Sequence, residues 1–156
     1  MAATIKPILD AVALALATNT AIADYITATW PGETLKVFKH ARWGRVAESD
    51  CPAVQITTGG RGRDTDKSVH SVIYALHIGI YTTDREQPEQ AGGIVSDPGA
   101  ENMEGLASLV ERCITDAIPA VDGYSFTSEP WQPDDMEWEH YAAFLLYLVS
   151  AKDNIS

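Results

Sequence analysis

Residues 69–83 (VHSVIYALHIGIYTT) constrain the fold most strongly, because two kinds of side chain alternate there with a period of two. One set is apolar and aromatic (Val72, Tyr74, Leu76, Ile78 and Ile80), and the other is small and mixed (Ile73, Ala75, His77, Gly79 and Tyr81). Such alternation among β-branched and aromatic residues is typical of a long strand with one buried face. We therefore predict a strand over 69–83, with a second face small enough for another element to approach closely.

A second constraint comes from residues 140–150 at the end of the chain, which are apolar on both faces of a predicted strand. Phe144, Leu146 and Leu148 alternate with Tyr141, Leu145, Tyr147 and Val149. A strand of this kind is buried on both sides, or it stays half-exposed until another subunit covers it.

The remaining patterns predict a single α+β domain over 1–156, with an antiparallel sheet of about four or five strands and two main helices packed on one face. Helical periodicity predicts a helix that Thr4 caps, with Pro7 in its first turn, and a short second helix over 21–27. The clearest helix follows the Asp97-Pro98 capping pair and ends near Pro119. Shorter strands are predicted over 35–40, 53–58 and 124–127, the second of them forming a hairpin with 69–82.

Three connecting segments are predicted to be loops. Residues 59–64 (GGRGRD) form a flexible basic hairpin tip, and residues 84–98 form the least structured stretch, which we expect to be mobile in the isolated protein. Residues 128–138 are rich in Pro, Trp and acidic side chains and predict a third loop. Loops of this length are often functional, so we expect contacts with partners there.

Charge is unevenly distributed along this acidic chain, whose formal net charge is −11. Residues 36–67 contain seven Lys or Arg and four Asp or Glu, a net +3, whereas residues 84–140 contain two Arg and fourteen Asp or Glu, a net −12. The overall acidity argues against a surface that grips DNA or an anionic membrane. The asymmetry fits either a solvated acidic surface or a head-to-tail contact between copies of the chain.

No catalytic, cofactor-binding or metal-binding motif stands out, so we expect no enzyme activity and no cofactor. An alternative is a small ligand-binding or metal-dependent hydrolytic domain that uses the cluster of Asp134, Asp135, Glu137, Glu139 and His140. Its spacing matches no usual metal-ligand pattern. The two cysteines, Cys51 and Cys113, predict reduced thiols in a reducing cytoplasm, and no apolar run is long enough to predict a membrane span.

The order of the predicted elements resembles the tail terminator or tail-completion (minor tail) proteins of long-tailed bacteriophages and prophages. The resemblance rests on a Pro-led strand (Cys51-Pro52-Ala53-Val54-Gln55-Ile56), a basic loop, a long strand ending HIGIYTTDRE, a long helix and Glu129-Pro130-Trp131 before the final strand. It implies a structural protein that forms a ring, commonly of six subunits, on the completed tail tube. Another neck or head–tail joining component is the alternative within the same class.

The same resemblance implies the partners: copies of the chain itself, the tail tube protein and the head–tail connector proteins, with DNA passing through the ring without specific binding. It implies a location at the tail–neck junction of the virion, and in the host cytoplasm during assembly. Aromatic and basic side chains in loops, together with residues of the two long strands, are the interface candidates. These are Arg42, Trp43, Arg45, Arg61, Arg63, His77, Trp131, Trp138, Tyr141 and Tyr147.

Overall fold

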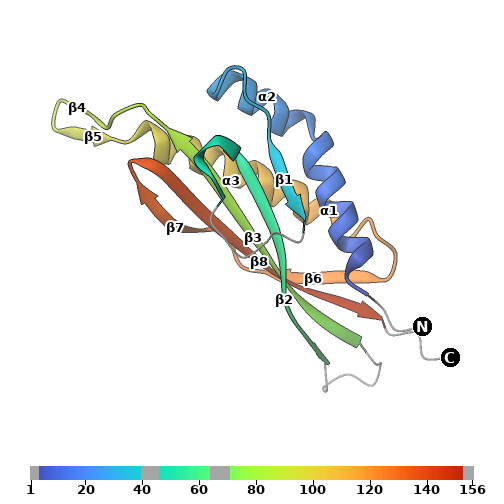
Figure 1. The fold of residues 1–156 in the computed structure, drawn as a ribbon. Coiled ribbons are helices and arrows are strands. Elements are labelled where there is room, and N and C mark those ends of the chain that lie inside the picture. The colour runs from blue at the N-terminus through green and yellow to red at the C-terminus, as the bar shows by residue number, and fades with distance from the viewer. Residues whose placement is uncertain (1–3, 40–45, 64–70, 153–156) are drawn as a thin grey trace.

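The computed structural model describes residues 4–39, 46–63 and 71–152, with the backbone alone for residues 60–63, 71, 135, 137 and 152. Three helices and eight strands follow one another with a short 3-10 turn between the first two strands (Figure 1). In chain order these are α1 (Lys6–Thr18), α2 (Thr20–Thr29), β1 (Lys36–Lys39), the 3-10 turn η1 (Glu48–Asp50), β2 (Ala53–Arg63), β3 (Ser71–Asp84), β4 (Glu89–Ala91), β5 (Ile94–Ser96), α3 (Pro98–Ala117), β6 (Tyr124–Ser128), β7 (Gln132–Glu137) and β8 (Glu139–Lys152).

The predicted α+β class is confirmed, although the sheet is larger than expected. Six strands form one sheet in the order β1-β2-β3-β8-β6, and β7 pairs with the first half of β8. All pairs are antiparallel except β1 with β2, which is parallel. The long strands β3 and β8 pair in register from Ser71 opposite Lys152 to Asp84 opposite Glu139, so they form the centre of the sheet.

Two segments predicted as loops are strands. The 59–64 prediction is wrong because β2 continues to Arg63 beyond a register shift between Thr58 and Gly60. Gly59 lies at this irregularity, where a Cβ would overlap the His77 imidazole. The 128–138 prediction is wrong because β7 forms an edge strand, and an edge tolerates Pro133.

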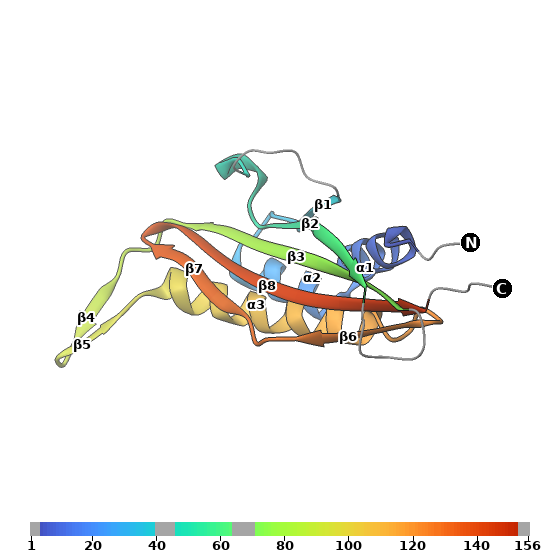
Figure 2. The ribbon, with the colours of Figure 1, turned by 90° about the horizontal axis from the view of Figure 1, so that it is seen from below.

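Residues 84–98 were predicted to be the least structured part of the chain, and this is wrong as well. They contain the hairpin of β4 and β5, in which Gly92 and Gly93 form the two-residue turn with φ of 59° and 80°. Two successive residues with positive φ are what the tightest hairpin turns require, and glycine adopts them without strain. We call residues 85–96 the arm, because Figures 1 and 2 show this hairpin extending beyond the end of the main sheet. Its mobility remains a prediction.

The helices begin where side-chain acceptors bind free backbone N–H groups, with one exception. Asn19 caps α2 by accepting a hydrogen bond from the Ile22 N–H at 2.9 Å. Asp97 caps α3 by accepting from the Gly99 and Ala100 N–H groups, as the sequence predicted. The predicted Thr4 cap is wrong, because α1 begins after Ile5 without a side-chain cap.

All three helices lie on one side of the main sheet (Figures 1 and 2), and the core lies between them and the sheet. Helix residues that are fully or almost fully buried there are Ile8, Leu9, Val12, Leu16, Ile22, Ile26, Met103, Leu106, Val110 and Ile114. Cys113 is also buried in this core, and burial raises the pKa of its thiol. Within the described ranges no single helix is long and apolar enough to cross a membrane, whereas α1 and α2 together, bent by 49°, meet that test on length and composition.

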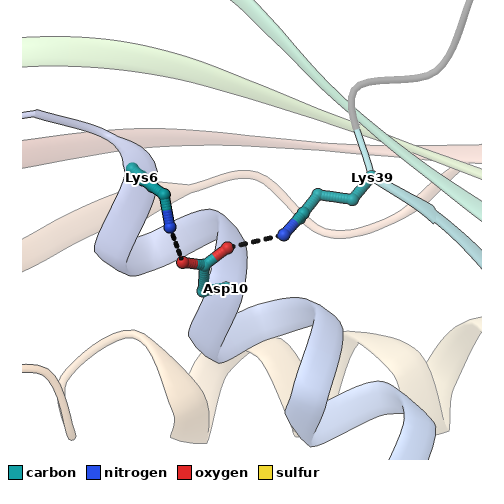
Figure 3. A network of polar contacts seen from close by, with 3 residues as sticks. All are labelled: Lys6, Asp10 and Lys39. Carbon is teal, nitrogen blue, oxygen red and sulfur yellow. Dashed lines mark hydrogen bonds and ion pairs between the residues drawn. The ribbon is translucent and has the colours of Figure 1, made fainter.

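An exposed ion-pair network joins the first helix to the edge of the sheet. The Asp10 carboxylate contacts the Lys6 Nζ at 2.6 Å from within α1 and the Lys39 Nζ at 2.7 Å from β1 (Figure 3). The hydrogen bonds from Lys39 and Lys6 lower the pKa of Asp10 from 3.8 to about 2. The network therefore fixes α1 against β1, although exposed pairs contribute little to stability.

We expect nuclear magnetic resonance titration of the Asp10 carboxyl carbon to give a pKa well below 3.8, and we expect added salt to raise it. The folded-state pKa lies below the unfolded one, so this contribution to stability is present above pH 3.8 and is lost as the pH falls towards 2. Lys39→Met should raise the Asp10 pKa more than Lys6→Met does. A carboxyl that titrates near its ordinary value in the wild-type protein would show that the network does not persist in solution.

Candidate assembly interface

The two faces of β8 differ in what covers them. The odd-numbered residues from Tyr141 to Ala151 are buried against the helices, whereas Phe144 and Leu148 on the other face are each 43% exposed. Leu146 lies between these two and is half-buried. The described residues provide no layer over this second face, which we call the open face of the sheet (Figure 2). The sequence left two possibilities for this strand, burial on both faces or exposure of one face until another subunit covers it. Burial on both faces is wrong for the single subunit.

The neighbouring strand β3 places a mixed row of side chains beside these large ones. Phe144 pairs with Gly79, Leu146 with His77 and Leu148 with Ala75. The apolar side chains of β8 therefore form a row along the open face, next to a row on β3 in which the exposed His77 lies between two small residues.

Ring side chains lie over two glycines of neighbouring strands, Gly79 on β3 and Gly59 on β2. A Cβ on Gly79 would come within 2.6 Å of the Tyr81 hydroxyl oxygen and within 2.7 Å of its Cε2. Burial raises the pKa of Tyr81, and the charge of Asp134 on β7 adds to this effect. His77 lies in the same way over Gly59 and is exposed to solvent. His77 is thus accessible to a partner.

The structure does not bring all predicted interface residues together. Arg42, Trp43 and Arg45 lie outside the described residues. Arg61 and Arg63 lie at the C-terminal end of β2, where their backbone is opposite Tyr74 and Val72 of β3. Their side chains lie outside the described part. These five candidates remain predictions.

Tyr141 and Tyr147 were predicted to contact a neighbouring subunit, and this is wrong. Both point towards the helices and are buried, at 2% and 0% exposure. The Tyr141 hydroxyl donates to the Asp97 carboxylate at 2.7 Å, and the Tyr147 hydroxyl donates to the Glu111 carbonyl at 3.2 Å. Burial raises the pKa of both phenols. These tyrosines connect the sheet to α3 within one subunit.

The two remaining tryptophan candidates differ from each other. Trp131 is partly buried against the core, and its backbone N–H donates to the Glu111 carboxylate at 2.7 Å. Trp138 is 43% exposed and its indole N–H donates to the Glu86 carbonyl at 3.1 Å. Trp138 therefore lies at the base of the arm, where a partner can reach it.

The arm exposes the most accessible apolar side chains of the described chain. Ile94 is 70% exposed and Val95 is 68% exposed. Sequence reasoning missed both residues because the segment was predicted to be a loop. The available signal was Gly92-Gly93 between two short segments, a spacing typical of a two-residue hairpin.

The ends of the sheet also differ in charge. The arm follows Asp84 at one end of β3, and residues 84–97 contain four Asp or Glu and one Arg. The strand end that carries Arg61 and Arg63 pairs with the other end of β3. Fourteen residues of strand separate the two ends, roughly 45 Å at the usual rise per residue. Within one subunit, the acidic arm is therefore far from the strand end that carries Arg61 and Arg63.

A groove of about 760 Å³ lies near the base of the arm. It is lined by the end of α2, the turn η1 and the end of β3, including Trp30, Glu48, Cys51, Thr83 and Arg85. The buried Trp30 indole N–H has no hydrogen-bond partner among the described residues. Burial raises the pKa of the Cys51 thiol, which favours its protonated form.

The alternative carboxylate cluster at residues 134–140 is only partly described. The side chains of Asp135 and Glu137 lie outside the described part, and the remaining members alternate along β7 and β8. The hypothesis of a metal-dependent hydrolytic domain is therefore neither supported nor contradicted here.

Comparison with known proteins gives a likeness of fold. No protein-family model matches the sequence, and no curated protein matches it. Among solved structures, the chain is similar to one in the virion of a native gene transfer agent (GTA) particle, with a TM-score of 0.55 and 13% identity. The similarity covers 92% of this chain and 93% of that one. Nearly the whole chain therefore shares its fold with a chain of that particle.

Proposed function

We propose that this chain is a non-enzymatic structural protein of a phage or phage-like particle, where it forms the ring that terminates the tail tube and offers a surface for joining the head. The observation that carries the proposal is the open face with its exposed Phe144 and Leu148. Large apolar side chains gathered on one uncovered face are typical of an assembly surface. The fold shared with a chain of a GTA virion supports the same class of function.

The distribution of charge allows a head-to-tail contact between copies. A two-fold dimer could also pair an acidic end with a basic end, but it would use both ends of both copies, whereas a head-to-tail contact leaves one end of each kind free for a further copy. Here the acidic arm and the basic end of β2 are different surfaces at opposite ends of β3. A single contact between them is head-to-tail, and such contacts close into a ring when the rotation between subunits allows it. Six copies follow from the resemblance to tail terminators.

The complete core of the single subunit indicates how assembly is controlled. The helices already bury one side of the sheet, so the monomer is expected to fold before it finds partners. Exposed charge pairs are worth about 0–1 kcal/mol each, so they orient subunits while apolar burial holds them together. A modest interface would keep the free protein monomeric until a tail tube increases its local concentration.

The test uses tail tubes assembled from the tube protein that is encoded in the same genome. We expect electron microscopy to show rings of this chain at one end of each tube, and light scattering to show a monomer or a ring without tubes. The variant Phe144→Thr with Leu148→Thr removes the exposed apolar side chains of the open face. It should leave the monomer folded and abolish the rings. A stable two-fold dimer, coating along the tube, or binding to the head connector alone would contradict the terminator role.

A further inference from the structure

The open face and the arm each lack a partner within the subunit, and they differ in shape. The open face is broad and carries the exposed Phe144 and Leu148 of β8, whereas the arm is a narrow hairpin with Ile94 and Val95 exposed. Figures 1 and 2 show the arm extending away from its own sheet. Its apolar side chains are therefore available to a surface that another molecule provides.

We infer that the arm of one subunit lies across the open face of a second copy of this chain, with its hairpin edge-on between Phe144 and Leu148. Ile94 and Val95 point to opposite faces of the hairpin, so one of them contacts Phe144 and the other contacts Leu148. This inference rests on the proposed ring and assigns its contact surfaces. The arm has only three residues in each strand and cannot by itself make a standard interface of about 800 Å² per partner. The open face is a broad apolar surface against which such an arm can lie.

Charge identifies a second copy, rather than an unrelated protein, as the occupant. Residues 84–97 carry a net charge of −3, from four Asp or Glu and one Arg. The end of β2 carries Arg61 and Arg63, whose backbone lies opposite Tyr74 and Val72 of β3. That strand end borders the half of the sheet to which Leu148 belongs, because Leu148 pairs with Ala75 and Ala75 pairs with Gly60. An acidic arm that reaches this half of a neighbouring sheet therefore meets charge of the opposite sign.

The base of the arm is fixed well enough to direct it. The Asp84 carboxylate accepts hydrogen bonds from the Asn102 side chain at 2.7 Å and from the Glu86 N–H at 3.1 Å. The Trp138 indole N–H donates to the Glu86 carbonyl. These contacts hold the chain on both sides of the point where it leaves the sheet. An arm with a fixed base loses less conformational freedom on docking than a free loop does.

The first experiment removes the apolar groups of the arm without changing its strand-forming character. Ile94→Thr with Val95→Thr keeps β-branched residues in the hairpin, so the monomer should fold and melt as the wild type does. Self-association, measured by light scattering over a concentration series and on tail tubes, should weaken at least about tenfold. Leu14→Gln is the matched control, because Leu14 is 66% exposed on α1, away from both surfaces, and association should be unchanged.

The second experiment mixes the arm variant with the open-face variant, Phe144→Thr with Leu148→Thr. Each variant keeps the surface that the other lacks, so a mixture contains one intact pairing of arm and face. At a protein concentration at which the wild type associates without tubes, we expect native mass spectrometry to detect a dimer with one copy of each variant and no larger ring. This result requires the arm and the open face to belong to the same contact.

The outcomes separate this inference from the proposed function. If the arm variant forms rings as readily as the wild type, arm docking is wrong and the ring stands. If the arm variant still associates with itself but no longer binds tail tubes, the arm contacts the tube protein and the inference is overturned. If the wild-type chain stays monomeric even on tubes, the ring and the arm contact are overturned together. Absence of the mixed dimer, at a concentration at which the wild type associates without tubes, also overturns the inference.

Discussion

Tyr147→Ala is expected to lower the free energy of unfolding by about 3–5 kcal/mol, the usual cost of removing a large aromatic side chain from a core. Tyr147 is fully buried, and its ring contacts Phe126 edge-on at 5.3 Å between centroids. Its hydroxyl also donates to the Glu111 carbonyl on α3. The substitution therefore leaves a cavity, removes an aromatic pair and leaves a carbonyl without this donor.

The matched control lies on the same strand three residues earlier. Phe144→Ala also removes an aromatic ring from β8, but Phe144 is on the open face and is 43% exposed. We expect it to cost about 1 kcal/mol of monomer stability and to weaken ring formation instead. Chemical denaturation of the monomer measures the first effect, and light scattering measures the second. Equal losses of stability for the two variants would show that the monomer covers both faces of its sheet.

This pair of residues also shows what the sequence could predict about the site. Period-two alternation correctly divided residues 140–150 into two sets, but both sets are apolar, so the pattern alone did not determine which set faces the helices. The preference for tyrosine at interfaces favoured Tyr141 and Tyr147. Their hydroxyl groups instead bind Asp97 and Glu111 of the helix that packs on them, and only the folded structure reveals those acceptors.

The missed strands have a related cause. Residues 132–137 contain a proline and three acidic residues, which disfavour a strand locally, yet they pair with β8 at the edge of the sheet. There, the backbone hydrogen bonds that β7 makes with β8 outweigh the low strand preference of its own residues. Strongly periodic segments, such as 71–83 and the stripe of α3, were predicted correctly because burial and local preference agree in them. Apolar residues on the short arm have no such periodicity.

Gly99→Val is the second substitution for which we expect a large effect, a loss of about 3 kcal/mol of stability. Gly99 is buried in the first turn of α3, and a Cβ at this position would overlap the Cε2 and Cζ atoms of the Tyr141 ring. Tyr141 cannot move aside easily, because its side chain is buried and its hydroxyl is bonded to Asp97. The absence of a side chain at Gly99 is therefore what allows α3 to lie so close to β8.

A double-mutant cycle distinguishes this steric conflict from a general loss of helix stability. Tyr141→Leu removes the ring atoms that the new side chain would overlap, so Gly99→Val should cost less in that background, by at least about 1 kcal/mol. The control Glu104→Val introduces a valine on the exposed side of α3. It should lower the free energy of unfolding by about 0.5 kcal/mol through helix propensity alone. If Gly99→Val costs the same with Tyr141 as with Leu at that position, contact with the ring does not set the spacing between α3 and the sheet.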